Sequence, residues 1–251
     1  MLMNDDSVLD RPKRILWIVT GSGSYMRCIS SIICEIAKNN VRLDLGFTGA
    51  GYEVSRMYGV QAKMLQCVAG VGEIYLEGWS RSFWPLVGRV AMRYYHLVVL
   101  APATSNTVAK IVHGIADSLA SAVASQALKT GTLLIVLPSD IAEINVTELP
   151  CRVNRDKCTA CGACIEACPV SAISLYEGKA RINLLTCIGC EKCVNACSFG
   201  AISCWEKTKY KASIIDLANL EKLKEFKRVV VVKNCEELRE KLRFEKVENR
   251  S

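Results

Sequence analysis

This sequence has few histidines, few prolines and no long apolar run. Its 251 residues include two histidines and six prolines. The apolar run from Ile15 to Thr20 is only as long as a strand, and the stretch 83–100 is interrupted by charged residues, so neither can span a bilayer. With 51% apolar and 23% charged residues, the chain is also unlike a disordered protein. We therefore expect a globular protein with a large core and no membrane-spanning helix.

Dense blocks of basic residues are absent too. The net charge is +7, but the Lys and Arg residues are spread along the chain. The start, Asn4-Asp5-Asp6, is acidic, whereas a secretory signal begins with basic residues. We therefore expect a cytoplasmic protein that binds neither nucleic acid nor a membrane.

Cysteine, in contrast, is abundant, with 14 residues. Eight of them form two runs of the pattern C-x2-C-x2-C-x3-C, offset by 29 residues, and Ala-Ile-Ser follows each run. Zinc sites use paired C-x2-C instead, whereas this longer pattern is typical of two-cluster ferredoxins. The spacing therefore predicts two [4Fe-4S] clusters held by soft sulfur ligands.

The fourth cysteine of each run is expected to bind the cluster of the other run, as it does in two-cluster ferredoxins. The predicted ligands of the first cluster are Cys158, Cys161, Cys164 and Cys197, and those of the second are Cys187, Cys190, Cys193 and Cys168. Six further cysteines are interpreted as unpaired buried thiols, because disulfides are rare in the cytoplasm. They are Cys28, Cys34, Cys67, Cys151, Cys204 and Cys235.

Strand-like and helix-like segments alternate on both sides of the cysteine runs. The expected strands are 15–20, 41–47, 96–100, 133–137 and 228–232, with a weaker one at 63–68, and the expected helices are 25–38, 106–113, 115–128, 214–226 and 235–242. Continuous apolar strands between helices indicate a parallel sheet covered on both faces.

The last predicted strand, 228–232, must pair with a sheet, and the sheet that it joins decides how the chain is divided into domains. The simplest arrangement is an α/β domain formed by 1–150 and 209–251, with a small α+β ferredoxin domain inserted at 151–208. The alternative is a separate third domain of about forty residues, which would bury too little surface to be stable alone.

Two polar loops follow predicted strands. Gly21-Ser22-Gly23-Ser24 precedes a helix, where backbone N–H groups favour a phosphate. The third glycine of the dinucleotide fingerprint is replaced by Met26, so NAD is not expected. Ala103-Thr104-Ser105-Asn106 follows another strand and offers hydrogen bonds to a polar ring. A plain turn for the first loop and a simple helix N-cap for the second remain open alternatives.

These loops carry a resemblance to a known family. T-G-S-G-S, Thr48 after the second strand, A-P-A-T-S-N-T and the segment 214–219 resemble the flavoproteins that include the FMN-dependent cysteine decarboxylases. The resemblance implies a flavodoxin-like fold, FMN as cofactor, and trimers or multiples of trimers. It implies a phosphate site at Gly21, Ser22, Gly23, Ser24 and Thr48, and a ring site at Ala103, Thr104, Ser105 and Asn106.

With its inserted ferredoxin module, the chain resembles the archaeal iron–sulfur flavoproteins that reduce dihydromethanopterin. This implies that a one-electron donor such as reduced ferredoxin supplies electrons through the clusters to FMN, which then reduces 7,8-dihydromethanopterin to tetrahydromethanopterin. Asn106 is the candidate catalytic residue. The alternative is a flavin electron-transfer protein that serves a protein partner and has no small substrate.

Other family chemistries are disfavoured by particular residues. His96 and His113 are expected to be structural, which leaves no histidine for a decarboxylase site, and Pro138-Ser139-Asp140 replaces the motif of the flavin prenyltransferases. Aromatic and arginine residues before the predicted strand 96–100 could contact a pterin, but a core or solvated role is favoured for each. They are Trp79, Phe83, Trp84, Tyr94, Tyr95, Arg81, Arg89 and Arg93.

Overall fold

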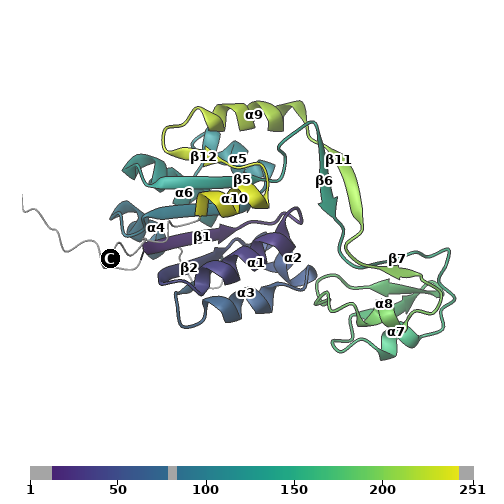
Figure 1. The fold of residues 1–251 in the computed structure, drawn as a ribbon. Coiled ribbons are helices and arrows are strands. Elements are labelled where there is room, and N and C mark those ends of the chain that lie inside the picture. The colour runs from purple at the N-terminus through teal and green to yellow at the C-terminus, as the bar shows by residue number, and fades with distance from the viewer. Residues whose placement is uncertain (1–12, 79–83, 243–251) are drawn as a thin grey trace, which may run out of the picture.

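The computed structural model describes residues 13–78 and 84–242. Figure 1 shows a large α/β domain and a small module that lies at the far end of a long two-stranded ribbon. No helix in these two ranges is long and apolar enough to cross a membrane.

A six-stranded parallel sheet forms the centre of the α/β domain, with the order β12-β5-β4-β1-β2-β3. Its strands are β1 (Lys13–Val19), β2 (Val41–Phe47), β3 (Ile74–Leu76), β4 (Leu97–Ala103), β5 (Leu133–Pro138) and β12 (Val229–Val231). The central strands are apolar throughout because both of their faces are covered: Trp17 packs into one core and Leu16 into the other.

Helices form a layer on each face of the sheet. One layer consists of α1 (Met26–Ala37), α2 (Gly49–Met57), α3 (Gln61–Val68) and α10 (Cys235–Leu242). The other consists of α4 (Trp84–Ala91), α5 (Ser105–Val112), α6 (Leu119–Thr130) and α9 (Ile214–Lys224). The predicted class, a parallel sheet between helices with a small cysteine-rich region, is therefore confirmed.

The strand order refines this prediction. Counted along the chain, the parallel strands follow the order 3-2-1-4-5-6, whereas a flavodoxin has the order 2-1-3-4-5. In the observed order the winding reverses beside β1, so the loops after β1 and β4 leave the sheet in opposite directions. Such a reversal opens a crevice at the carboxyl edge of the sheet.

The cysteine-rich module is built from short elements. The ribbon that carries it pairs β6 (Ile144–Glu148) with β11 (Lys207–Lys211) in antiparallel fashion. Beyond the ribbon lie β7 (Arg152–Val153), α7 (Ala163–Glu166), β8 (Ile173–Tyr176), β9 (Lys179–Ile182), α8 (Lys192–Ala196) and β10 (Ile202–Ser203). After the ribbon returns, α9 and β12 lead back into the sheet, where β12 pairs with β5.

One helix boundary differs from the prediction, and one predicted element is wrong. Ser118 begins α6 with a capping box, so this helix starts four residues later than expected. The segment 63–68 is part of helix α3 and not a strand. Met64 and Val68, four residues apart, face the core together, and a short apolar run cannot distinguish the two structures.

The prediction that six cysteines are unpaired is also wrong. They form the disulfides Cys28–Cys235, Cys34–Cys67 and Cys151–Cys204. Two of these bonds join α1 to helices that pack against it, and the third joins the two chain segments that enter and leave the module. The pairing depends on tertiary neighbours, which cysteine spacing along the chain does not reveal.

The Cys34–Cys67 bond gives a stability prediction. It closes a loop of 33 residues, and its loss should lower the free energy of unfolding by about 3 to 4 kcal/mol, because the unfolded chain gains freedom. Guanidinium unfolding of the Cys34→Ser/Cys67→Ser variant, compared with the oxidised wild type, measures this difference. Equal stability, or alkylation of Cys34 in the unreduced native protein, would contradict the assignment.

Candidate functional site

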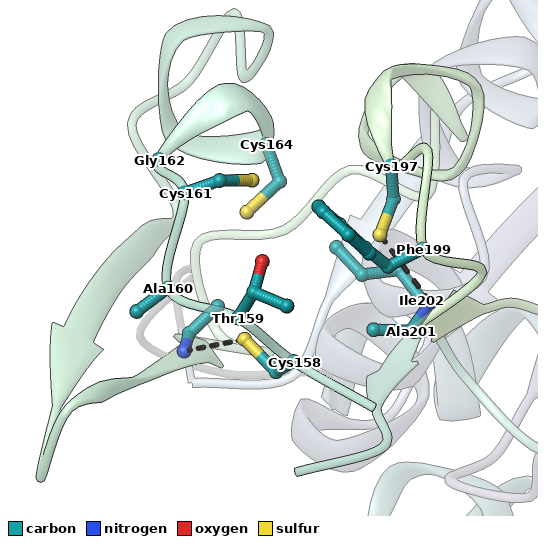
Figure 2. Close-up of a pocket in the computed structure, with 11 residues that line it drawn as sticks. Cys158, Thr159, Ala160, Cys161, Gly162, Cys164, Cys197, Phe199, Ala201 and Ile202 are labelled. Carbon is teal, nitrogen blue, oxygen red and sulfur yellow. Dashed lines mark hydrogen bonds between the residues drawn. The ribbon is translucent and has the colours of Figure 1, made fainter. Parts of the chain in front are cut away.

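The first cysteine cavity lies in the module between α7 and the turn that precedes β10. Figure 2 shows that Cys158, Cys161 and Cys164 from the first run and Cys197 from the second run line it together. Phe199 and Ile202 form part of its apolar wall. The cysteine that completes the set thus comes from the other run.

A second cavity repeats this arrangement. It is lined by Cys187, Cys190 and Cys193 of the second run and by Cys168 of the first run. Cys151, one half of a disulfide, adds a further wall. Exposure follows the 29-residue repeat: the first and third cysteines of each run are buried, the second is exposed and the fourth is half-buried.

Backbone N–H groups point at the sulfur atoms in both cavities. Ala172 N donates to Cys168 Sγ (3.2 Å) and Ala201 N to Cys197 Sγ (3.3 Å), each four residues along the chain. Ala180 N donates to Cys158 Sγ (3.4 Å), and this bond helps to hold the pKa of the Cys158 thiol below its ordinary value. Hydrogen bonds of this kind stabilise negative charge on sulfur.

Burial acts in the opposite direction on other thiols. It raises the pKa of Cys164 and Cys187, and it raises the pKa of Cys193 to about 11. A metal that binds here must displace the proton from each thiol. Across residues 13–78 and 84–242, no three His, Cys, Asp or Glu side chains are placed to hold a single metal ion.

The other candidate site lies at the carboxyl edge of the sheet, where the winding reverses beside β1. Thr20, buried at the end of β1, joins the two loops of this edge. Its Oγ1 donates to the Pro102 carbonyl (2.8 Å) and accepts from Thr104 N (3.0 Å). Ser139 N, after β5, donates to the Ala103 carbonyl (2.8 Å). The predicted residues 21–24 and 103–106 therefore lie at one edge, as the sequence implied.

Glycine is required in the first loop because the backbone approaches its neighbours closely. A Cβ on Gly21 would lie 2.5 Å from Ala50 Cβ, and a Cβ on Gly23 would collide with the Tyr58 hydroxyl. The loop is thus pressed against the start and the end of α2. A side chain at either position would displace the turn.

Several predicted hydroxyls already have partners within the chain. Thr48 Oγ1 accepts from Gly51 N (3.0 Å) and caps α2, and Thr104 Oγ1 accepts from Thr107 N (3.2 Å) and caps α5. Ser24 Oγ lies 3.4 Å from the Tyr210 hydroxyl, which donates to the Ser139 carbonyl (2.7 Å). Asn106, in contrast, is exposed, and its side-chain amide makes no hydrogen bond with the described part of the chain.

Sequence analysis did not identify some residues that shape this edge. Glu77 directly follows β3 and accepts hydrogen bonds from Gly49 N (3.1 Å) and Leu119 N (2.5 Å), at the N-termini of α2 and α6. It was missed because β3 itself was not predicted. Tyr58 and Tyr210 were missed because nothing in their local sequence connects them to this loop.

The aromatic and arginine candidates lie elsewhere or outside the described residues. Trp79, Arg81 and Phe83 belong to the latter group. Tyr95, just before β4, is buried and its hydroxyl donates to Asp44 Oδ2 (2.6 Å). Tyr94, Arg89 and Arg93 also precede β4, so they approach the sheet from the edge opposite to Asn106, while Trp84 begins α4 and is exposed.

Arg42 and Arg89 form a cluster of ion pairs with Asp44 and Glu73. Hydrogen bonds from Tyr75 and Arg89 are the main causes that lower the pKa of Glu73 to about 2, and Arg42 also pairs with this carboxylate. Burial is the main cause that raises the pKa of Tyr95. His96 also has a structural role, because its Nδ1 accepts from Arg14 N (3.1 Å).

Comparisons with known proteins match this chain to a flavoprotein family and to a 4Fe-4S binding domain. The family model "Flavoprotein" matches residues 3–188, and the model "4Fe-4S binding domain" matches residues 180–203, which include the second cysteine run. The chain is 36% identical to the dihydromethanopterin reductase (acceptor) of Methanocaldococcus jannaschii over 232 residues, 90% of this chain and 94% of the relative. The corresponding protein of Methanosarcina mazei is 37% identical over 172 residues, 66% of this chain and 72% of the relative.

Among solved structures, DmrB from Burkholderia xenovorans in complex with FMN, described as a cubic protein cage for redox transfer, shares the fold. The TM-score is 0.57 with 24% identity, covering 93% of this chain and 94% of DmrB. The chain therefore belongs to the flavoprotein family, with a 4Fe-4S binding domain, and is a homologue of the dihydromethanopterin reductases (acceptor).

Proposed function

We propose that this protein takes electrons from a one-electron donor, passes them through two [4Fe-4S] clusters to FMN, and reduces 7,8-dihydromethanopterin to tetrahydromethanopterin. The observation that carries the proposal is that one chain combines two four-cysteine cavities with a polar edge at the winding reversal of a parallel sheet. The pterin substrate is supported by the dihydromethanopterin reductases (acceptor), which match up to 90% of the chain. Reduction of the pterin consumes two electrons and two protons, so two donor molecules are oxidised per turnover.

The cysteine cavities support crossed ligation. The proposed ligands of the first cluster are Cys158, Cys161, Cys164 and Cys197, and those of the second are Cys187, Cys190, Cys193 and Cys168, in agreement with the lining of each cavity. The donor set fits, because four sulfur atoms surround each volume and N–H groups are aimed at several of them. Clusters of this type accept and release single electrons.

The carboxyl edge fits FMN. The turn Gly21–Ser24 with Thr48 is proposed to hold the phosphate, and Ala103, Thr104, Ser105 and Asn106 to meet the ring. The proposal is supported by the packed glycine turn and by the exposed amide of Asn106, which makes no hydrogen bond with residues 13–78 or 84–242. When bound, FMN supplies the conversion of single electrons into a hydride equivalent. The role of Thr20 is to fix the distance between the two loops, and that of Asn106 is to orient the ring or the substrate.

The domain boundaries and the partners belong to the same proposal. Residues 1–150 and 209–251 would form the flavin domain and 151–208 the ferredoxin domain, which is supported by the pairing of β12 with β5.

The donor is proposed to be a small protein such as reduced ferredoxin. Assembly as a trimer or a multiple of trimers is supported by the cubic cage described for the similar DmrB.

The cluster assignment predicts an effect at a distance in sequence. Cys168→Ala should damage the cluster held by Cys187, Cys190 and Cys193, because Cys168 Sγ lines that cavity. Electron paramagnetic resonance of the reduced protein would show one altered and one native cluster. Cys197→Ala is the matched variant and should alter the other signal. If Cys168→Ala instead alters the signal that Cys161→Ala alters, ligation is not crossed.

The flavin turn predicts a loss of FMN affinity in Gly23→Ala, because the added Cβ collides with Tyr58 and displaces the turn. The expected loss is roughly tenfold, the effect of about 1.4 kcal/mol. Fluorescence titration of the flavin-free protein with FMN measures it. Gly88→Ala is the control, because a Cβ there meets nothing within 4 Å. Equal affinity of the two variants would place the phosphate elsewhere.

The reaction itself is tested anaerobically with reduced ferredoxin and dihydromethanopterin. Wild type should form the tetrahydropterin, and Asn106→Leu should be slower by roughly fivefold, since a lost hydrogen bond is worth about 1 kcal/mol. Asn39→Leu, a change at an exposed residue that follows α1, should be unaffected. A wild type that reduces artificial acceptors rapidly but not the dihydropterin would support the electron-transfer alternative without a small substrate.

A further inference from the structure

The module contacts the α/β domain at a second place besides the ribbon, where two loops touch through glycines. Gly59 follows α2, and Gly189 lies between Cys187 and Cys190 in the loop of the second cavity. A Cβ on Gly59 would lie 2.7 Å from the Ile188 carbonyl, and a Cβ on Gly189 would lie 2.8 Å from Gly59 N. Both glycines have positive φ, +67° and +61°, which other residues rarely adopt. The backbones therefore meet at a distance that no side chain would permit.

Trp205 fills the space behind this contact. Its ring atom Cη2 lies 2.9 Å from the Cβ position of Gly189, and its ring centroid is 5.4 Å from that of Tyr58. The Arg27 guanidinium lies over the same indole at 4.8 Å. Trp205 Nε1 donates to Glu191, a residue of the second cavity wall. One end of the indole is thus bonded to the module, and its ring packs on the α/β domain.

Trp205 packs against both hydrophobic cores that meet here. It contacts the core beneath α1, α2 and α3, which includes Tyr58, and the small core formed by Cys151, Ala172 and Cys187. Tyr58 donates to the Glu148 carbonyl at the end of β6, and Arg27 pairs with the Glu148 carboxylate at 3.7 Å. Tyr58 and Arg27 therefore contact both Trp205 and Glu148, so they connect the tryptophan to the strand that leads into the module.

Tyr58 extends the contact to the flavin edge. Its hydroxyl occupies the place where a Cβ of Gly23 would be. A continuous line of packed groups therefore runs from the Gly189 loop through Trp205 and Tyr58 to the turn Gly21–Ser24. This line begins at the second cavity, whose wall includes Ile188 and Glu191, and not at the first, whose wall is formed by residues such as Thr159 and Phe199.

We propose that Trp205 is the positioning residue that seats the second cysteine cavity against the flavin edge, so that electrons leave the module from the second cluster through the Trp205–Tyr58 contact. The inference rests on the proposed function for the identity of the two redox groups. The external one-electron donor is oxidised, and two successive electrons with two protons reduce the flavin. The first cavity is then the entry side of the module.

The test compares Trp205→Leu with Trp205→Phe, which keeps an aromatic ring at the contact. The control is Tyr176→Leu, a half-exposed module aromatic that lies under Arg181. Holoprotein with native iron and FMN content is mixed anaerobically with a reduced viologen, and cluster and flavin absorbance are followed without any pterin. In Trp205→Leu the clusters should be reduced at the wild-type rate and the flavin more slowly by roughly tenfold or more. Trp205→Phe and Tyr176→Leu should stay near wild type.

A second measurement does not depend on flavin. Amide hydrogen exchange of segments 56–61 and 187–191 should become faster in Trp205→Leu and stay unchanged in Tyr176→Leu, because the seat between them is lost. Unchanged flavin reduction, or unchanged exchange in both segments, would overturn the inference. Failure to reduce dihydropterin would count only against the proposed substrate, since neither measurement contains it.

Discussion

The position of β1 between β2 and β4 is the constraint on which the rest of this structure depends. Chain winding reverses there, so the loops after β1 and β4 diverge at the carboxyl edge and leave room between helices that would otherwise close it. Thr20 then joins the two loops with hydrogen bonds to Pro102 and Thr104, which fixes their spacing. Most polar residues proposed for FMN lie at these two loops, and Thr48 follows β2.

The cysteine-rich module is attached at the same carboxyl edge of the sheet. Strand β5 ends there at Pro138, the ribbon begins at Ile144, and Tyr210 on the returning strand bonds back to Ser139. A segment of this size buries little apolar surface, so we expect its order to depend on the ribbon, on the Cys151–Cys204 bond and on the metal that its cysteines would hold. Folding and cluster assembly are therefore expected to be coupled in this part of the chain, while the α/β domain has two complete cores of its own.

Sequence reasoning succeeded where the signal is local. The pattern predicted Val41–Phe47 as a strand and Cys235–Leu242 as a helix with the observed bounds, since apolar periodicity and flanking polar residues mark both. The four-cysteine cavities could be anticipated because ligand spacing within a run is itself a local property. The grouping of the two polar loops followed from the general geometry of parallel sheets.

What the sequence could not show depends on long-range contacts. The strand order departs from that of flavodoxins because β3 lies beside β2, and β3 has only three residues. Segment 63–68 is helical because its apolar residues pack in the core beside α1. The same packing of α1 on α3 brings Cys34 next to Cys67. Trp205 and Tyr58 are far apart in sequence, and nothing in either segment indicates that their rings stack.

The central claim is that one chain holds two clusters and one flavin mononucleotide. Anaerobic purification followed by iron analysis, acid extraction of the flavin and an absorption spectrum tests it most directly. The account predicts about eight iron atoms per chain, four for each cysteine cavity, together with one FMN. Four iron atoms or fewer in fully reconstituted protein, or release of FAD in place of FMN, would contradict it.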